Sequence, residues 1–169
     1  LATISYMTTA GLAAAATVRV GFYLGSNDFR NLRMAAYSLL VMAMIVMCGW
    51  ALLFIGARNL FPYLYVDDLT VIPVAASLLA IAGFFQLADG TQVVCAAALR
   101  GLQDVKIPSL FIFISYWVIG LPLGYYLAFE LKMGGEGVWW GLFIGLMVTA
   151  LALFIRLQKL IKNLQHLRS

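Results

Sequence analysis

The sequence predicts an all-α, polytopic membrane protein with five transmembrane helices, and three observations lead to this fold class. Of the 169 residues, 64% are apolar and 11% are charged, whereas soluble domains contain about 45–50% apolar and about 25% charged residues. The charged residues divide the chain into apolar runs close to the ~20 residues that cross a bilayer as a helix. These runs are continuously apolar and lack the alternation that is typical of membrane β-strands.

The five predicted spans follow one another through short connections. They cover approximately residues 1–24, 34–57, 71–99, 107–129 and 137–157. The first connection contains Gly, Ser, Asn and Asp, which commonly end one helix and begin the next. We expect residues 1–169 to form one unit, because the connections leave no room for a second domain. The first run begins without Met and without a basic leader, so we expect a fragment of a longer protein and no signal peptide.

Pro122 lies well inside the fourth span, where its ring removes a backbone hydrogen bond. Gly120 and Gly124 flank it at GxxxG spacing, so we predict a kink or hinge formed by these three residues. The same spacing recurs in the pairs Gly21 with Gly25 and Gly141 with Gly145. Because glycines at this spacing let helices approach closely in lipid, they predict a tight bundle.

Basic residues gather on one side of the predicted membrane. They are Arg30, Arg33, Arg100, Lys106, Arg156, Lys159, Lys162 and Arg168. The other side has only Arg58 and Lys132, and the aromatic residues near its span ends, Trp139 among them, resemble an interfacial belt. We therefore predict a multi-pass protein of the inner (plasma) membrane with its C-terminus in the cytoplasm. Arg100 is interpreted as an anchor to lipid phosphate in preference to a partner of Asp104.

The net charge of +4 is accounted for by this asymmetry and by attraction to anionic lipid, so it gives no reason to expect nucleic-acid binding. Cys48 and Cys95 each lie in an apolar run, where a thiol packs like a small hydrophobic group, and we predict no disulfide. No span carries a histidine, a paired acid or a serine with a base, which disfavours an enzyme. No metal-ligand or phosphate-binding motif occurs, and we expect no cofactor.

Asp89 is the one charged residue of the third span. It lies 11 residues from Arg100, or ~16 Å along a helix, which is near the middle of a hydrocarbon core about 30 Å thick. An acid at this depth costs about 2.5–3.5 kcal/mol on insertion scales and usually faces a cavity or the bundle interior. Gln86 and Gln92 lie three residues to either side, and Tyr116 lies at nearly the same depth on the next span. We predict a polar site of these four residues, with a hydrogen bond between Tyr116 and Asp89.

A carboxylate at this depth can be neutralised by a proton, by Na⁺ or by an organic cation. Because these occupants exclude one another, the site has the chemistry that antiport requires. Two other interpretations stay open. Asp89 is then either a protonated, hydrogen-bonded structural group or a residue that lines water without binding anything.

Three segments carry a resemblance to a known family. They are VRVGFYLGSND at 18–28, FFQLADGTQVVCAAALRGLQD at 84–104 and SYWVIGLPLGY at 115–125. In this order and spacing they resemble the C-terminal half of MATE (multidrug and toxic compound extrusion) transporters, most closely the NorM-like branch. The resemblance covers nearly the whole chain. It implies that the five spans are helices eight to twelve of a twelve-helix transporter and form most of one six-helix lobe.

The resemblance also implies a function. Family members export cationic, amphipathic compounds in exchange for Na⁺ or H⁺, so the expected partners are organic cations, the lipid bilayer and the N-terminal lobe of the same polypeptide. Asp89 matches the membrane acid of the tenth helix and would take part in the cation site, with a possible Na⁺ at its carboxylate. The family's partner acid lies on the seventh helix, outside this chain.

Two alternatives to multidrug export are weighed. An exporter of lipid-linked or anionic substrates would need several buried basic residues, and only Arg19 comes near a span interior. A non-transporting membrane assembly subunit would use the polar side chains Gln86, Asp89 and Gln92 of the third span only to hold helices together.

Overall fold

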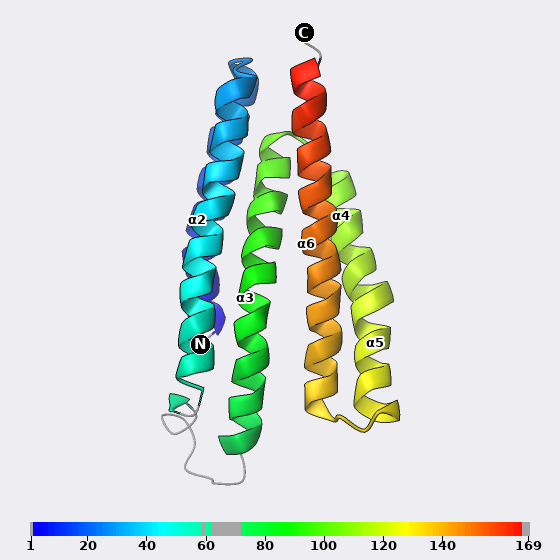
Figure 1. Cartoon of the computed structure of the whole chain (residues 1–169). Helices are drawn as coiled ribbons and strands as arrows, with labels where there is room; N and C mark the ends of the chain where they lie inside the picture. Colours follow the sequence, from blue (N-terminus) through cyan, green and yellow to red (C-terminus); the bar gives the residue numbers. More distant parts are fainter. Residues whose placement is uncertain (1, 59, 62–71, 167–169) are drawn as a thin grey trace.

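The chain folds into five long helical rods in a computed structural model that describes residues 2–58, 60–61 and 72–166 (Figure 1). The rods are α1 (Ala2–Gly25), α2 (Phe29–Gly56), α3 (Ile72–Gly101), a composite helix over Lys106–Glu130, and α6 (Gly135–His166). The predicted all-α fold is confirmed. Residues 1 and 71 of the predicted spans, and Arg168 of the predicted basic side, lie outside the described residues.

Two helices continue beyond the apolar runs from which they were predicted. α2 begins at Phe29, where the Asp28 side chain caps it by accepting a hydrogen bond from the Asn31 backbone N–H at 3.1 Å. α6 runs to His166 because its last turns stay amphipathic, with Leu157 and Ile161 buried in the core. Charged residues end an apolar run without ending the helix, since long basic side chains reach the membrane surface from within it.

Four rods are long and apolar enough to cross a membrane. They are Phe29–Gly56, Ala75–Gly101, Lys106–Glu130 and Gly135–Leu164. The first predicted span, α1, is 24 residues long and is not among these four; it carries several hydroxyl side chains and Arg19. Ser5 and Thr9 of α1 are buried, and Thr17 donates a hydrogen bond of 3.0 Å to the Ala97 carbonyl of α3. Part of the polarity of α1 therefore faces the bundle interior.

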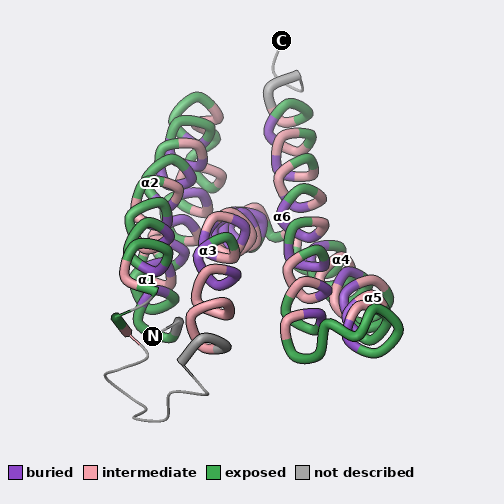
Figure 2. Tube along the Cα trace, turned by 60° about the horizontal axis from the view of Figure 1, so that its bottom comes forward, coloured by how far each residue is buried: buried purple, intermediate pink, exposed green. Residues whose placement is uncertain are grey.

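α3 is the central helix of the bundle. It packs against α1 and α2 on one side and against α6 on the other, while the composite helix packs mainly on α6 (Figures 1 and 2). Fully buried apolar side chains gather where α1 ends and α2 begins, around Val20, Leu32 and Leu99. Apolar side chains also cover much of the outside, such as Leu52 at 73% exposure, as expected for helices whose surroundings are lipid.

The composite helix consists of α4 (Lys106–Phe113), the π-helix η2 (Ile114–Gly120), α5 (Leu121–Tyr125) and the π-helix η3 (Tyr126–Glu130). Just before Pro122, the backbone N–H of Leu121 donates to the carbonyl of Tyr116, five residues earlier. π-helical segments lie on both sides of the proline, where the ordinary i to i−4 ladder cannot be completed. The hinge role of Gly120, Pro122 and Gly124 stays a prediction.

Glycines hold the composite helix close to α6. A Cβ atom added to Gly141 would overlap the backbone of Gly124, and one added to Gly145 would lie 2.8 Å from the Ser115 carbonyl oxygen and 3.1 Å from the Gly120 Cα. The predicted close approach is confirmed for these two GxxxG pairs, which face each other.

The third GxxxG pair behaves differently. Gly21 lies against Gly101 of α3. A Cβ atom added to Gly101 would meet the Thr17 carbonyl oxygen at 2.7 Å, whereas Gly25 faces open space at the end of α1. The prediction is therefore wrong for Gly25. The partner of Gly21 on α3 is the single glycine Gly101 at the helix end, which sequence spacing did not indicate.

Candidate functional site

Asp89 points from the middle of α3 into a cavity of about 350 Å³ between α1, α3 and α6. The lining residues from α3 are Ala82, Phe85, Gln86 and Asp89; those from the other helices are Thr3, Ser5, Tyr6 and Trp139. The carboxyl group is thus directed at the bundle interior. We expect this direction, because an acid that faced lipid at this depth would be costly.

Oxygen-bearing side chains form one wall of this cavity. Gln86 is 4% exposed and Ser5 is 1% exposed, and both lie within the lining together with Thr3. Hydroxyl, amide and carboxylate oxygens are the ligands that hard cations prefer. Within the described part of the chain, no group of three or more His, Cys, Asp or Glu residues could hold a metal ion. Asp89 is therefore the one acid in a mostly neutral donor set among the residues that line the cavity.

Aromatic rings form another wall. Phe85 of α3 packs edge-to-face on Trp139 of α6, with ring centroids 5.5 Å apart, and also lies 5.5 Å from the ring of Phe143. Tyr6 adds a half-exposed ring from α1. Aromatic faces attract organic cations within about 6 Å. The cavity therefore combines one acid with neutral oxygens and aromatic surface, which suits an amphipathic cation.

Gln92 and Tyr116 lie together, apart from this cavity. The Tyr116 hydroxyl donates a hydrogen bond of 3.2 Å to Oε1 of Gln92. This pairing replaces the hydrogen bond to Asp89 that the sequence led us to predict. The reason is helical geometry: Gln86 and Gln92 are six residues apart, which turns their side chains about 120° from each other. Gln86 shares the cavity with Asp89, and Gln92 turns towards the composite helix.

Sequence reasoning missed the contributions of α1 and α6 to the site. Thr3, Ser5 and Tyr6 belong to a hydroxyl-rich stretch of α1, and this unusual polarity for a membrane helix was the available signal. Trp139 was interpreted as part of an interfacial belt, but the structure places it in the cavity wall. Its helix position alone does not distinguish these two environments.

An ion pair lies at the basic end of the bundle. Arg156 Nε of α6 is 2.5 Å from Oδ2 of Asp104, in the turn between α3 and α4. Asp104 is therefore paired with α6, and Arg100 is exposed. This arrangement agrees with the interpretation of Arg100 as a lipid anchor and connects the turn to the last helix.

These features define the class of the protein: a multi-pass helical membrane protein with a polar and aromatic cavity between α1, α3 and α6. A family model described as MatE matches residues 1–126, and the chain belongs to this family. It is 44% identical to a probable multidrug resistance protein NorM of Agrobacterium fabrum, over 96% of this chain and 36% of that relative. It is 40% identical to a multidrug resistance protein NorM of Burkholderia vietnamiensis, over 89% of this chain and 34% of that relative.

Solved structures agree with this assignment. The chain superimposes on the eukaryotic MATE transporter AtDTX14 with a TM-score of 0.87 at 26% identity, covering 98% of this chain and 38% of that one. An inward-facing MATE family transporter of the MOP superfamily, 20% identical, shares the fold with a TM-score of 0.88 over 99% of this chain and 39% of that one. The predicted family and its NorM-like relatives are confirmed, and the chain spans about a third of the length of these relatives.

Proposed function

We propose that this chain supplies five consecutive helices of the C-terminal lobe of a multidrug efflux antiporter, in which Asp89 couples the export of organic cations to the entry of Na⁺ or H⁺. The observation that carries the proposal is the Asp89 cavity, where one acid at the depth of the bilayer centre faces neutral oxygens and aromatic rings. Membership in the MatE family and similarity to proteins named for multidrug resistance support it.

The coupling follows from competition for one negative charge. A cation bound at Asp89 favours the ionised carboxylate, whereas a proton neutralises it and removes the attraction for an organic cation. Na⁺ would use the carboxylate together with the oxygens of Ser5 and Gln86, while an amphipathic cation would also use the rings of Phe85 and Trp139. If inward-open and outward-open states bind these occupants differently, a gradient of one drives transport of the other.

The remainder of the polypeptide completes this proposed site. By the family resemblance, a second acid comes from the seventh helix and the other face of the substrate cavity from the N-terminal lobe. We further propose residence in the inner membrane with a cytoplasmic C-terminus. The basic residues Arg30, Arg33 and Lys162 support this orientation, because they lie at the end of the bundle where α6 finishes (Figure 1).

Transport by the full-length protein tests the proposal. Purified protein in proteoliposomes is given a Na⁺ or H⁺ gradient, and movement of a fluorescent organic cation is followed for wild type, Asp89→Asn and the matched control Glu130→Gln, whose side chain is exposed at the end of η3. We expect wild type and Glu130→Gln to transport, and folded Asp89→Asn to lose gradient-driven transport. The gradient that drives wild type identifies the coupling ion.

The alternative interpretations have distinct outcomes in the same assay. Normal transport by Asp89→Asn would make this acid structural and place coupling elsewhere. A folded full-length protein that moves no substrate under either gradient would favour an assembly subunit. Export of lipid-linked or anionic substrates is disfavoured, since the described residues that line the cavity include no Lys or Arg.

A further inference from the structure

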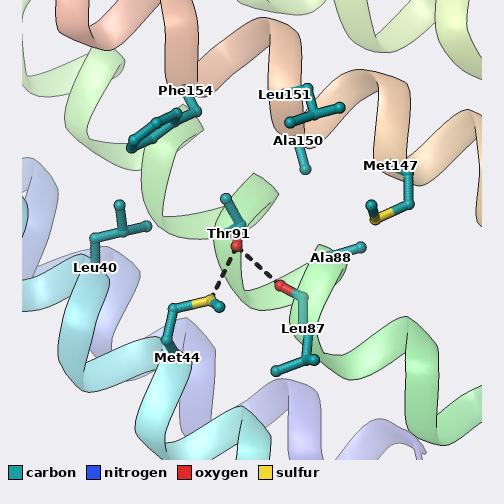
Figure 3. Close-up of a pocket in the computed structure, with 9 residues that line it drawn as sticks. All are labelled: Leu40, Met44, Leu87, Ala88, Thr91, Met147, Ala150, Leu151 and Phe154. Atoms are coloured by element: carbon teal, nitrogen blue, oxygen red, sulfur yellow. Dashed lines mark hydrogen bonds between the residues drawn. The ribbon is translucent and has the colours of Figure 1, made fainter.

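A second cavity lies on the opposite face of α3 from Asp89. It has a volume of about 320 Å³ and is bordered by α2, α3 and α6 (Figure 3). Its lining includes Met44 of α2, Leu87 and Thr91 of α3, and Met147, Leu151 and Phe154 of α6. We call this cavity the apolar groove.

The apolar groove has almost no polar groups that could bind water. Among the described residues that line it, only Thr91 has a hydroxyl. This hydroxyl donates a hydrogen bond to the Leu87 carbonyl oxygen at 2.9 Å or to the Met44 sulfur at 3.1 Å (Figure 3). A water molecule is retained in a cavity only where it finds two to four polar partners. The groove is therefore suited to hydrocarbon.

The groove opens to the outside of the bundle at the depth of lipid acyl chains. Leu151 and Met147, on its α6 side, are 55% and 39% exposed. Leu40 and Met44, on its α2 side, lie 7 and 11 residues from Arg33, which is ~10 and ~16 Å along the helix. One leaflet of hydrocarbon is about 15 Å thick. Leu87, on its α3 side, lies 13 residues from Arg100, or ~20 Å. The groove thus extends from the inner half of the leaflet on the basic side to just beyond the bilayer midplane.

Basic side chains stand above the groove on two of its helices. Arg33, Tyr37, Leu40 and Met44 follow one face of α2 at helical spacing, and the Arg33 guanidinium lies over the Tyr37 ring at 5.8 Å from its centroid. On α6, the face that carries Leu151 and Phe154 continues through Gln158 to Lys162. Both Arg33 and Lys162 are exposed. The ends of α2 and α6 that carry them extend beyond the end of α3 at the same end of the bundle (Figure 1).

We propose that the apolar groove binds an anionic phospholipid from the leaflet on the basic side, with an acyl chain between α2, α3 and α6 and its phosphate at Arg33 and Lys162. An acyl chain supplies the long, wholly apolar occupant that the groove accepts, and the two cations complement the head group. Each cation near a membrane surface strengthens binding of anionic lipid by about 1 kcal/mol, or about fivefold in affinity. This site is distinct from the Asp89 cavity and does not depend on the proposed transport function.

Lipid retention by the full-length protein tests this inference. The delipidated protein is titrated in detergent with phosphatidylglycerol or phosphatidylcholine of identical acyl chains, and bound lipid is counted by native mass spectrometry. We expect wild type to bind phosphatidylglycerol about 25-fold more tightly than phosphatidylcholine, because the effects of two cations at about fivefold each multiply. The double variant Arg33→Gln, Lys162→Gln should bind the two lipids equally.

A tryptophan in the groove separates acyl-chain binding from head-group attraction. Leu151→Trp should abolish the specific binding of both lipids, whereas Met42→Trp, an equally large change on the opposite, 51% exposed face of α2, should leave binding unchanged. Arg58→Gln, at the other end of the bundle, is the control for charge. Thermal unfolding in the same detergent checks folding, and Leu151→Phe provides a smaller blocking side chain if the tryptophan variant does not fold.

Three results would overturn the proposal. Equal affinity of wild type for the two lipids would remove the role of Arg33 and Lys162. Unchanged binding by folded Leu151→Trp or Leu151→Phe, or equal loss in Met42→Trp, would place bound lipid elsewhere. Absence of retained lipid would show that phospholipid does not occupy the groove.

Discussion

Replacing Gly141 by alanine tests the close contact between α6 and the composite helix. An added methyl group would overlap the backbone of Gly124 and lie 2.8 Å from the Gly120 carbonyl oxygen, whereas carbon and oxygen atoms of neighbouring helices normally approach to about 3.3–3.6 Å. The obstructing atoms belong to the backbone, so no side chain can rotate away. The two helices must therefore separate by more than about half an ångström, the difference between 2.8 Å and the normal approach of about 3.3–3.6 Å.

The energetic cost follows from this geometry. Overpacking a well-packed interior costs typically about 1–3 kcal/mol and occasionally more, and contact with backbone on the opposing helix places Gly141→Ala at about 3 kcal/mol or above. Gly145→Ala should cost less, about 1–3 kcal/mol, because its nearest contacts are 2.8 Å and 3.1 Å away. Gly49→Ala is the matched control, since an added Cβ there meets nothing within 4 Å. It should be neutral or stabilising by up to about 1 kcal/mol, through helix propensity.

Thermal unfolding of the full-length protein in detergent measures these differences. We expect the unfolding midpoints to follow the order Gly49→Ala, wild type, Gly145→Ala and Gly141→Ala, from highest to lowest. The reasoning is refuted if Gly141→Ala unfolds at or above the temperature of Gly49→Ala. Such a result would mean that α6 and the composite helix do not pack through their glycines in the folded protein.

Three further predictions concern individual side chains. Trp139→Leu should raise the KM for an organic cation about two- to fivefold, through loss of about 0.5–1 kcal/mol of cation–π attraction, while Trp117→Leu, at a 62% exposed position, should not; an equal change in both would argue against the aromatic wall. Tyr116→Phe should retain gradient-driven transport, because its hydroxyl donates to a glutamine and not to Asp89; complete loss of transport would contradict this placement. Thr17→Val should lower the unfolding free energy by about 0.6 kcal/mol and by at most about 1.7, the range for hydrogen bonds between membrane helices, since it removes the 3.0 Å bond to α3; denaturant unfolding that shows no loss would refute it.

The relation between the two cavities follows from the position of α3. One face of this helix carries Asp89 and Gln86, and the opposite face carries Leu87 and Thr91. A membrane helix in the middle of a bundle can thus border a polar cavity and an apolar groove at nearly the same depth. Binding of lipid on one face and of cations on the other would both act on the packing of α3 against α6.

Local features of the sequence were sufficient to predict the fold class and part of the site. Long apolar runs predicted the helices because a bilayer requires each span to satisfy its own backbone hydrogen bonds. Asp89 and Gln86 were predicted together because they lie three residues apart on one helix. Helix ends were less accurate, as α6 shows by continuing to His166, because an amphipathic tail remains helical after its apolar run has ended.

What the sequence by itself determined is the class of protein, the order of its helices and the position of Asp89 in the middle of the third helix, since all three depend on composition and on spacing along a single stretch of chain. Only the tertiary structure decided that Tyr6 and Trp139 share a cavity with Asp89, that Tyr116 pairs with Gln92, and that the apolar groove forms between three helices. The physical reason is that each of these contacts depends on the rotation of one helix against another, which close glycine packing and side-chain shape determine across distant parts of the chain.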